Sequence, residues 1–275
     1  MRKKLIGPFL FVLIISFPLQ AKGQFTPEEI SERGKWEEFL KAAAIVGQKQ
    51  QKSREAVTEP WELNLEKDGI AKKALWKDAA GRMGGKIENW RWEIAAYRLD
   101  KYLGLNMVPP TVEKRFMEKR GSCQLWVDYW MKASKKNEEN IKVPNIKVFY
   151  YNRSTYLRWA FDNLIGNEDR HAGNIFITED WRTILPDHSR CFRTSDKFTK
   201  KLIYTQSHPE GPKIMKELPR AFVEKLKSLD AEHIRDCVGE YLTDKEIEAV
   251  LQRRDLMLEV INKRINELGE DQVLY

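Results

Sequence analysis

The stretch from residue 161 to residue 192, FDNLIGNEDRHAGNIFITEDWRTILPDHSRCF, constrains the fold more than any other part of the chain. Asp169 opens a first polar cluster, Asp-Arg-His-x-x-Asn, that ends at Asn174, and a second cluster, Pro-Asp-His-Ser, places Asp187 thirteen residues further on. A β-prone run, a turn and a second β-prone run join them, at 175–177, 178–180 and 182–185. This pattern predicts a hairpin that returns Asp187 to the neighbourhood of Asn174, where acid and amide oxygens suit a hard cation such as Mg²⁺.

Phosphoryl transfer requires such an arrangement, because its transition state is stabilised by positioning and by cations that bridge phosphate oxygens. Asp169 precedes Asn174 by five residues, which is the spacing of the aspartate and asparagine in a kinase catalytic loop. The stretch resembles the catalytic segment of the protein-kinase-like superfamily. The resemblance is to its atypical branches: phosphatidylinositol 3/4-kinases with their Asp-Arg-His-x-x-Asn loop, HipA-like kinases and secreted Fam20-type kinases.

This resemblance implies ATP and Mg²⁺ or Mn²⁺ as cofactors, and it assigns roles to the matching residues. Asp169 positions and deprotonates the acceptor hydroxyl, with His171 as a rival for that role, while Asn174 and Asp187 bind metal. His188 stands where kinases have the Phe of Asp-Phe-Gly; since the aspartate is the chelating member, metal binding is expected to persist.

Two readings of other kinds remain open for the same residues. Single Asp, His and Asn residues between strands commonly serve as turn formers and caps. His171, His188 and Cys191 form a possible zinc set, because His188-x-x-Cys191 has the spacing of metal ligands, although no convincing fourth ligand is present. A metal-dependent hydrolase or nuclease built on the two histidines is therefore an alternative function.

The region before this stretch resembles a kinase small lobe. Apolar residues alternate from Trp61, a turn follows at 67–69, and the run from residue 70 ends at Lys77. A helix is predicted from Glu88 to Leu103 by its apolar spacing. The resemblance implies that Lys77 holds the α and β phosphates and pairs with Glu93 of this helix; Glu88 and Lys73 are the competing acid and cation.

The segment 53–60 lacks the glycines with which kinases usually cover the phosphates. Ser53 and Thr58 are the candidate phosphate contacts in their place. The missing glycines also favour an alternative in which the protein is a catalytically inactive kinase-like binding or scaffold module.

Residues 1–23 are predicted to be a signal peptide, with a basic start, an apolar run and small residues near Gly23. The protein is therefore expected to be exported, periplasmic or extracellular, with no stable membrane anchor after cleavage. The whole chain has a net charge of +7, four of those positive charges lie in 1–23, and the remaining charge of about +3 gives no strong indication of nucleic-acid binding. Three cysteines, Cys123, Cys191 and Cys237, are too few for a disulfide framework.

The expected fold class is α+β: a two-lobed protein-kinase-like fold with a small β-rich N-lobe carrying one αC-type helix and a mostly helical C-lobe. The expected divisions are a helical extension over 24–55, the N-lobe over 56–130 and the C-lobe over 131–275, with the lobe hinge near Asp128–Met131. The polar, lysine-rich segment 132–147 is expected to be a solvated loop, and 151–164 a helix. The partner is a hydroxyl-bearing acceptor of protein, lipid or sugar type, and the basic run at 190–201 suggests an acidic one.

Overall fold

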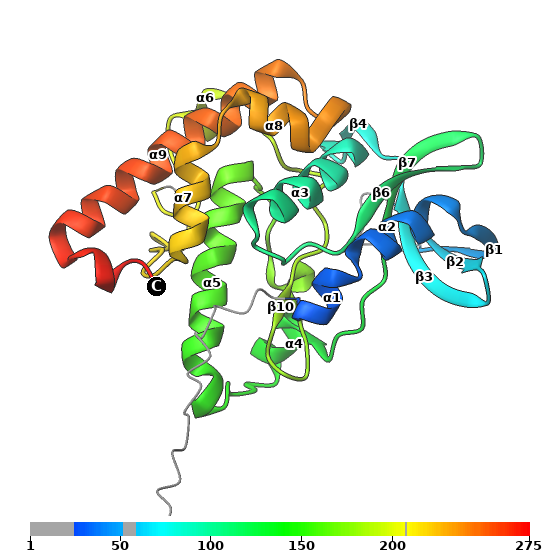
Figure 1. The fold of residues 1–275 in the computed structure, drawn as a ribbon, viewed down its shortest axis with the longest axis horizontal. Helices are drawn as coiled ribbons and strands as arrows, with labels where there is room; N and C mark the ends of the chain where they lie inside the picture. Colours follow the sequence, from blue (N-terminus) through cyan, green and yellow to red (C-terminus); the bar gives the residue numbers. More distant parts are fainter. Residues whose placement is uncertain (1–24, 52–58, 207) are drawn as a thin grey trace, which may run out of the picture.

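The protein consists of a lobe built around a β-sheet and a larger helical lobe (Figure 1). The structure is a computed structural model that describes residues 25–51, 59–206 and 208–275. The predicted Ser53 and Thr58 contacts and the signal peptide lie outside the described residues.

The N-lobe sheet is antiparallel, with strand order β1-β2-β3-β7-β6. Its strands are β1 Ala44–Gln50, β2 Trp61–Lys67, β3 Ile70–Lys77, β6 Thr111–Phe116 and β7 Lys119–Leu125. Asp68 and Gly69 form the two-residue turn between β2 and β3, and both have positive φ angles, as a type I′ hairpin turn requires. The turn predicted at 67–69 is therefore present.

The N-terminal extension is helical only in its first part. Helices α1 (Pro27–Ser31) and α2 (Arg33–Ala42) pack near the sheet, whereas 44–50 forms the edge strand β1, so the prediction of a helical extension to residue 55 was wrong. The buried ammonium of Lys114 donates hydrogen bonds to the carbonyls of Leu40, Lys41 and Ala43. These are the carbonyl groups that a helix leaves unpaired at its C-terminus, so Lys114 fixes the point where α2 ends.

A short hairpin and a long helix follow the third strand. The hairpin comprises β4 (Ala80–Met83) and β5 (Lys86–Asn89), and α3 spans Trp90–Leu103. The Asn89 side chain caps the first turn of α3, and Gly104 ends the helix with a φ angle of 75°. Glu88, predicted to start this helix, lies on β5 instead because the cap is one residue later.

The C-lobe is mainly helical, and its long helix α9 packs against α5 (Figure 1). The elements are α4 Ala133–Glu138, α5 Asn145–Ile165, α6 Asp196–Thr199, α7 Arg220–Ser228, α8 Ala231–Val238 and α9 Asp244–Leu268, with short 3₁₀ turns η1 Ala172–Asn174, η2 Gly239–Tyr241 and η3 Glu270–Gln272. The prediction of a loop over 132–147 was wrong, since this segment contains α4 and the beginning of α5.

The predicted catalytic hairpin is present. Strands β9 (Phe176–Ile177) and β10 (Thr183–Ile184) pair antiparallel, and β8 (Met131–Lys132) adds to the other edge of β9. This small sheet therefore brings the end of the interlobe connection beside the catalytic segment.

Two hydrophobic clusters form the interior. The smaller one joins α2 to one face of the N-lobe sheet, and the larger one joins α3 to the helices of the C-lobe. Helix α3 thus packs with the C-lobe, and the indole of Trp92 donates a 2.7 Å hydrogen bond to Glu246 of α9. Within the described residues, no helix has the length and apolar character needed to span a membrane.

Candidate active site

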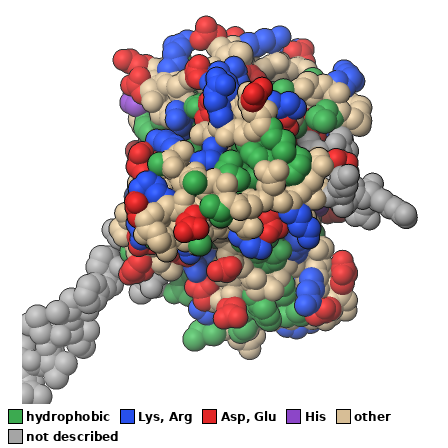
Figure 2. Space-filling model, turned by 90° about the vertical axis from the view of Figure 1, so that its right-hand side faces the viewer, with side chains coloured by type: hydrophobic (Ala, Val, Ile, Leu, Met, Phe, Trp, Pro, Cys, Tyr) green, Lys and Arg blue, Asp and Glu red, His purple; other side chains and the backbone are tan. Residues whose placement is uncertain are grey.

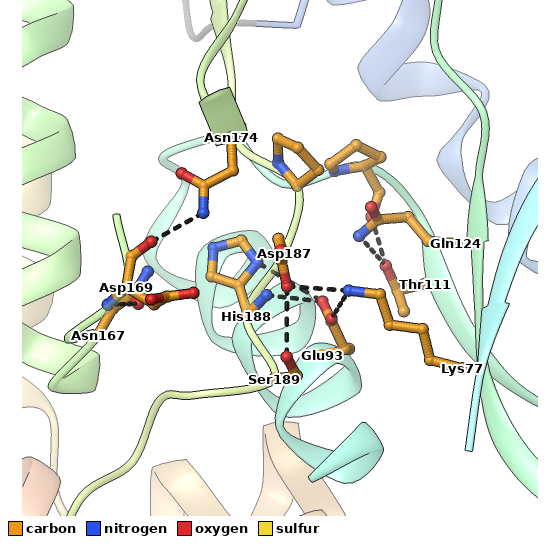
Figure 3. A network of polar contacts seen from close by, with 12 residues as sticks. Lys77, Glu93, Thr111, Gln124, Asn167, Asp169, Asn174, Asp187, His188 and Ser189 are labelled. Carbon is orange, nitrogen blue, oxygen red and sulfur yellow. Dashed lines mark hydrogen bonds and ion pairs between the residues drawn. The ribbon is translucent and has the colours of Figure 1, made fainter. Parts of the chain in front are cut away.

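A buried lysine joins the two lobes at the centre of the site (Figure 3). The Lys77 ammonium at the end of β3 lies 2.6 Å from an oxygen of Glu93 on α3 and 2.9 Å from Oδ1 of Asp187. The other Glu93 oxygen accepts a 2.9 Å hydrogen bond from the backbone N–H of His188. Glu93, Lys77 and Asp187 therefore form a bridge from the N-lobe helix to the catalytic segment of the C-lobe.

The pKa values of the three residues in this bridge depend on one another. Burial opposes the charge of Lys77, but Asp187 and Glu93 outweigh burial and raise the pKa of Lys77 above its ordinary value. Burial likewise favours the neutral form of Asp187, yet the Lys77 ammonium dominates and lowers the pKa of Asp187 below its ordinary value. The pKa of Glu93 is raised by its burial. Lys77 and Asp187 consequently form an ion pair whose cation can exchange its carboxylate contact for a phosphate.

The alternative ion pairs, with Lys73 as the cation or Glu88 as the acid, are not formed. Lys73 is exposed on β3 and pairs with Glu62 at 2.6 Å, while Glu88 pairs with Arg190. Lys77 and Glu93 are thus the pair that the structure brings together.

A second interlobe bridge holds Asp169. Its Oδ1 lies 2.8 Å from the Arg190 guanidinium, which also contacts the buried carboxylate of Glu88 at the end of the β4–β5 hairpin. Lys86 of the same hairpin lies 3.4 Å from Oδ1. Oδ2 of Asp169 makes no hydrogen bond to the described residues and the side chain is 22% exposed, so one oxygen is held and the other is left available.

Arg170 holds the stretch 161–192 together through hydrogen bonds. Its buried guanidinium donates to Asp162, to the carbonyls of Asn174 and Pro186, and to Nε2 of His188 at 2.8 Å. Because arginine can only donate, Nε2 of His188 must accept. Burial and the neighbouring Arg170 lower the pKa of His188 well below its ordinary value, so the ring is neutral and serves as a structural acceptor.

Asn174 and Asp187 present the oxygens that a divalent cation would need (Figure 3). Nδ2 of Asn174 donates to the Asp169 carbonyl at 2.8 Å, and Oδ1 accepts from the His171 backbone at 3.1 Å, which leaves a second lone pair on that oxygen. Oδ1 of Asp187 is held by Lys77, while Oδ2 has no hydrogen bond to the described residues and the side chain is 41% exposed. Carboxylate and amide oxygens of this kind fit Mg²⁺ or Mn²⁺.

The zinc alternative has no support in this geometry. His171 is exposed and its ring nitrogen accepts from the Gly173 N–H, whereas His188 and Cys191 are buried. Burial raises the pKa of Cys191 well above its ordinary value, which disfavours the thiolate that zinc requires. Over residues 25–51, 59–206 and 208–275, no group of three His, Cys, Asp or Glu side chains is gathered for a metal.

The connection between the lobes runs from Trp126 to Trp130. The backbone N–H of Trp126 bonds to Lys73, that of Trp130 bonds to Ile177, and the ring of Tyr129 stacks on Phe176 with centroids 4.0 Å apart. The hinge was predicted near Asp128, which lies within this connection. Gln124 and Thr111, hydrogen-bonded at 2.9 Å, lie on the N-lobe side of the same site (Figure 3).

Three residues of the site were not found from the sequence: Arg170, Arg190 and, in its actual role, Glu88. Arg170 lies inside the Asp-Arg-His motif, so its place in the motif was visible although its contacts were not. Arg190 was interpreted only as part of a basic run, and its buried partner Glu88 is 102 residues away in sequence. Long-range ion pairs of this kind leave no local pattern.

Comparison with known proteins gives the fold. The chain matches no protein-family model and no curated protein sequence. It is similar to the structure of hydra Fam20 with sugar, with a TM-score of 0.62 and 14% identity over 94% of this chain and 95% of that one. It is also similar to the Golgi casein kinase, with a TM-score of 0.60 and 14% identity over 88% of this chain and 79% of the other, and to its Mn/ADP complex, with a TM-score of 0.61 and 16% identity over 89% and 78%.

These similarities confirm the expected two-lobed α+β architecture. They also agree with the Fam20-type resemblance, whereas the resemblances to phosphatidylinositol kinases and HipA-like kinases stay predictions. At 14–16% identity the likeness establishes structure alone. On these grounds, this chain has a protein-kinase-like fold, shared with the Fam20 and Golgi casein kinase structures.

Proposed function

We propose that this protein is an exported ATP-dependent kinase that transfers the γ-phosphoryl group to a hydroxyl acceptor with the help of a divalent metal. The observation that carries the proposal is the Glu93–Lys77–Asp187 bridge beside Asp169. It combines a cation for phosphates, a carboxylate for metal and a second carboxylate for the acceptor, which are the parts that phosphoryl transfer requires. One solved structure with this fold contains Mn and ADP, which supports the same choice of cofactors.

Each residue has a distinct part in the proposed reaction. Lys77, held by Glu93, would contact the α and β phosphates. Asn174 and Asp187 would hold Mg²⁺ or Mn²⁺, which when bound neutralises charge on the phosphate oxygens. Oδ2 of Asp169 would accept the proton of the acceptor hydroxyl. His171 is exposed and caps η1 through its ring, so Asp169 is the better candidate for the base.

Transfer of label from ATP tests the proposal. The protein is incubated with γ-labelled ATP, Mn²⁺ or Mg²⁺, and fractions containing protein, lipid and sugar acceptors. We expect label transfer by the wild type, and a loss of at least about a thousandfold in Asp169→Asn and Asp187→Asn, because each removes a charge that acts in the transition state. Lys77→Met is expected to lose transfer as well.

Lys73→Met provides the matched control, since Lys73 is exposed on the same strand and pairs with Glu62. It should retain wild-type transfer. A thermal shift with ATP and Mn²⁺ distinguishes the alternative of an inactive binding module: that alternative predicts nucleotide binding without transfer. Equal labelling by wild type and Asp169→Asn would contradict the assigned base.

A further inference from the structure

The first turns of α5 carry an exposed apolar surface. In the described part of the chain, twelve large apolar side chains are exposed, and five of them lie between residues 130 and 150. Ile146, Phe149 and Tyr150 are 80%, 50% and 52% exposed. Their spacing of three and four residues places them on one side of the helix. We call the surface formed by these three residues the α5 tip.

The α5 tip lies at one end of the molecule. Figure 1 shows the first turn of α5 at the lower end of the molecule, and Figure 2, which looks from the side of the N-lobe sheet, shows hydrophobic side chains at that end among acidic and basic ones. Single exposed apolar residues are common on soluble proteins, but a group of three neighbours exposed by half or more is characteristic of an interaction surface.

Packing on the adjoining turn holds the α5 tip in place. The rings of Phe149 and Tyr150 contact each other edge to face at 5.7 Å. Arg153, one turn further along the same side, lies 4.0 Å from the Phe149 ring and donates to Glu217 at 2.7 Å. The apolar residues are therefore presented to the outside by a supported helix.

The segment that leads into the α5 tip carries an excess of positive charge. The segment 132–147 contains five lysines and only two acidic residues: Lys132, Lys135, Lys136, Lys142, Lys147, Glu138 and Glu139. Glu139 and Lys135 pair at 3.8 Å, which leaves four lysines and one acid in this segment. Apolar side chains beside a lysine-rich segment fit the boundary of an anionic membrane, where the apolar groups enter the acyl region and the lysines meet headgroups.

We propose that the α5 tip binds the surface of anionic lipid membranes. The lysine excess selects this occupant over a second copy of the chain, because two such surfaces would repel each other. Helix α5 spans 21 residues, or about 30 Å, and its other end carries the catalytic segment. A membrane contact at the tip is thus separate from the phosphoryl-transfer site, and the proposal is independent of the proposed function.

Vesicle binding tests this proposal. The chain from Gln24 onward, the predicted mature form, is sedimented with vesicles of phosphatidylcholine alone and of phosphatidylcholine mixed equally with phosphatidylglycerol. We expect binding to the mixed vesicles only, weakening as salt is raised because the headgroup attraction is screened. Ile146→Glu/Phe149→Glu should bind at least about tenfold more weakly, since two apolar side chains that would enter the membrane are lost.

The matched control is Leu268→Glu, which places the same charge at an exposed apolar residue of α9. It should bind mixed vesicles like the wild type, and circular dichroism should show that every variant is folded. Equal binding to both vesicle types, no binding at all, or wild-type binding by the double variant would each overturn the proposal. Self-association that the double variant abolishes, without vesicle binding, would assign the surface to a protein partner instead and would also overturn it.

Discussion

Arg190 connects Asp169 to Glu88 of the N-lobe. Its guanidinium contacts Glu88 on one side and Oδ1 of Asp169 on the other, and its side chain is mostly buried. A planar guanidinium can hold two carboxylates at once with fixed geometry, which a lysine cannot do as well. In the proposed reaction, Arg190 would therefore be a positioning residue that holds Oδ1 of Asp169 and leaves Oδ2 for the acceptor.

Arg190→Gln should lower kcat about a hundredfold, because a small displacement of the base costs that much in rate. The KM for ATP should change little, since the Lys77 bridge is separate. Glu88→Gln should have a similar effect, and the double variant should be no worse than Arg190→Gln alone because both residues act through one contact.

Arg82→Gln is the control for this prediction, since Arg82 is exposed on the same hairpin and, within the described part of the chain, bonds only to the Gly85 carbonyl. Its kcat should equal that of the wild type. A fall in ATP affinity that matches the fall in kcat would show instead that Arg190 merely maintains the fold.

Asp100 makes the stability of the fold depend on pH. Burial raises the pKa of this carboxyl to about 7, although Arg33 and the Met107 N–H oppose the shift. The folded state retains the proton that the unfolded state releases above its pKa of about 4, so stability falls as pH rises between these values. Asp100→Asn cannot titrate, and its free energy of unfolding should rise relative to that of the wild type by about 2 kcal/mol from pH 5 to pH 7. Urea unfolding at several pH values measures this difference, and a difference that is constant with pH would contradict the prediction.

Helix α9 supports the stretch 161–192 through one buried arginine. Arg253 is fully buried and donates to the carbonyl of Leu164 at 2.7 Å and to that of Arg193 at 2.6 Å. These two carbonyls lie at the two ends of the catalytic segment. A helix with no predicted chemical role thus holds both ends together.

Arg253→Met should reduce the free energy of unfolding by about 3 kcal/mol, because two buried carbonyls lose their donors while the volume is nearly retained. Lys263→Met, at an exposed position of the same helix, should change it by less than about 0.5 kcal/mol. Denaturant unfolding monitored by tryptophan fluorescence gives both values, and equal effects of the two substitutions would be incompatible with the role assigned to Arg253.

At the scale of the whole molecule, the sequence predicted those features that leave a local pattern. The hairpin after Asn174 was found because turn formers separate two β-prone runs, and the start of α9 was found because Thr243 and Glu246 form a capping box. The sequence pattern of α3 did not predict that this helix packs with the C-lobe. Its apolar stripe indicates a buried face without identifying the element that covers it.

The errors have a related cause. Residues 44–50 form a strand because β2 provides a partner and Lys114 ends α2, and both are long-range effects that the local sequence does not show. The pairing of Lys77 with Glu93 was expected only through the family resemblance, whereas the pairing of Arg190 with Glu88 required coordinates. Local sequence therefore predicted the hairpin after Asn174 better than it predicted the long-range contacts of Arg190.

The two interlobe bridges begin on one short piece of chain. Glu88 and Glu93 lie five residues apart, at the end of β5 and in the first turn of α3, and each leads through one cation to a different aspartate. A displacement of this single piece would release the nucleotide-side lysine and the acceptor-side arginine in the same movement. In the proposed reaction, the nucleotide-binding part and the acceptor-binding part of the site would therefore form or come apart together. The enzyme would then have a single active arrangement.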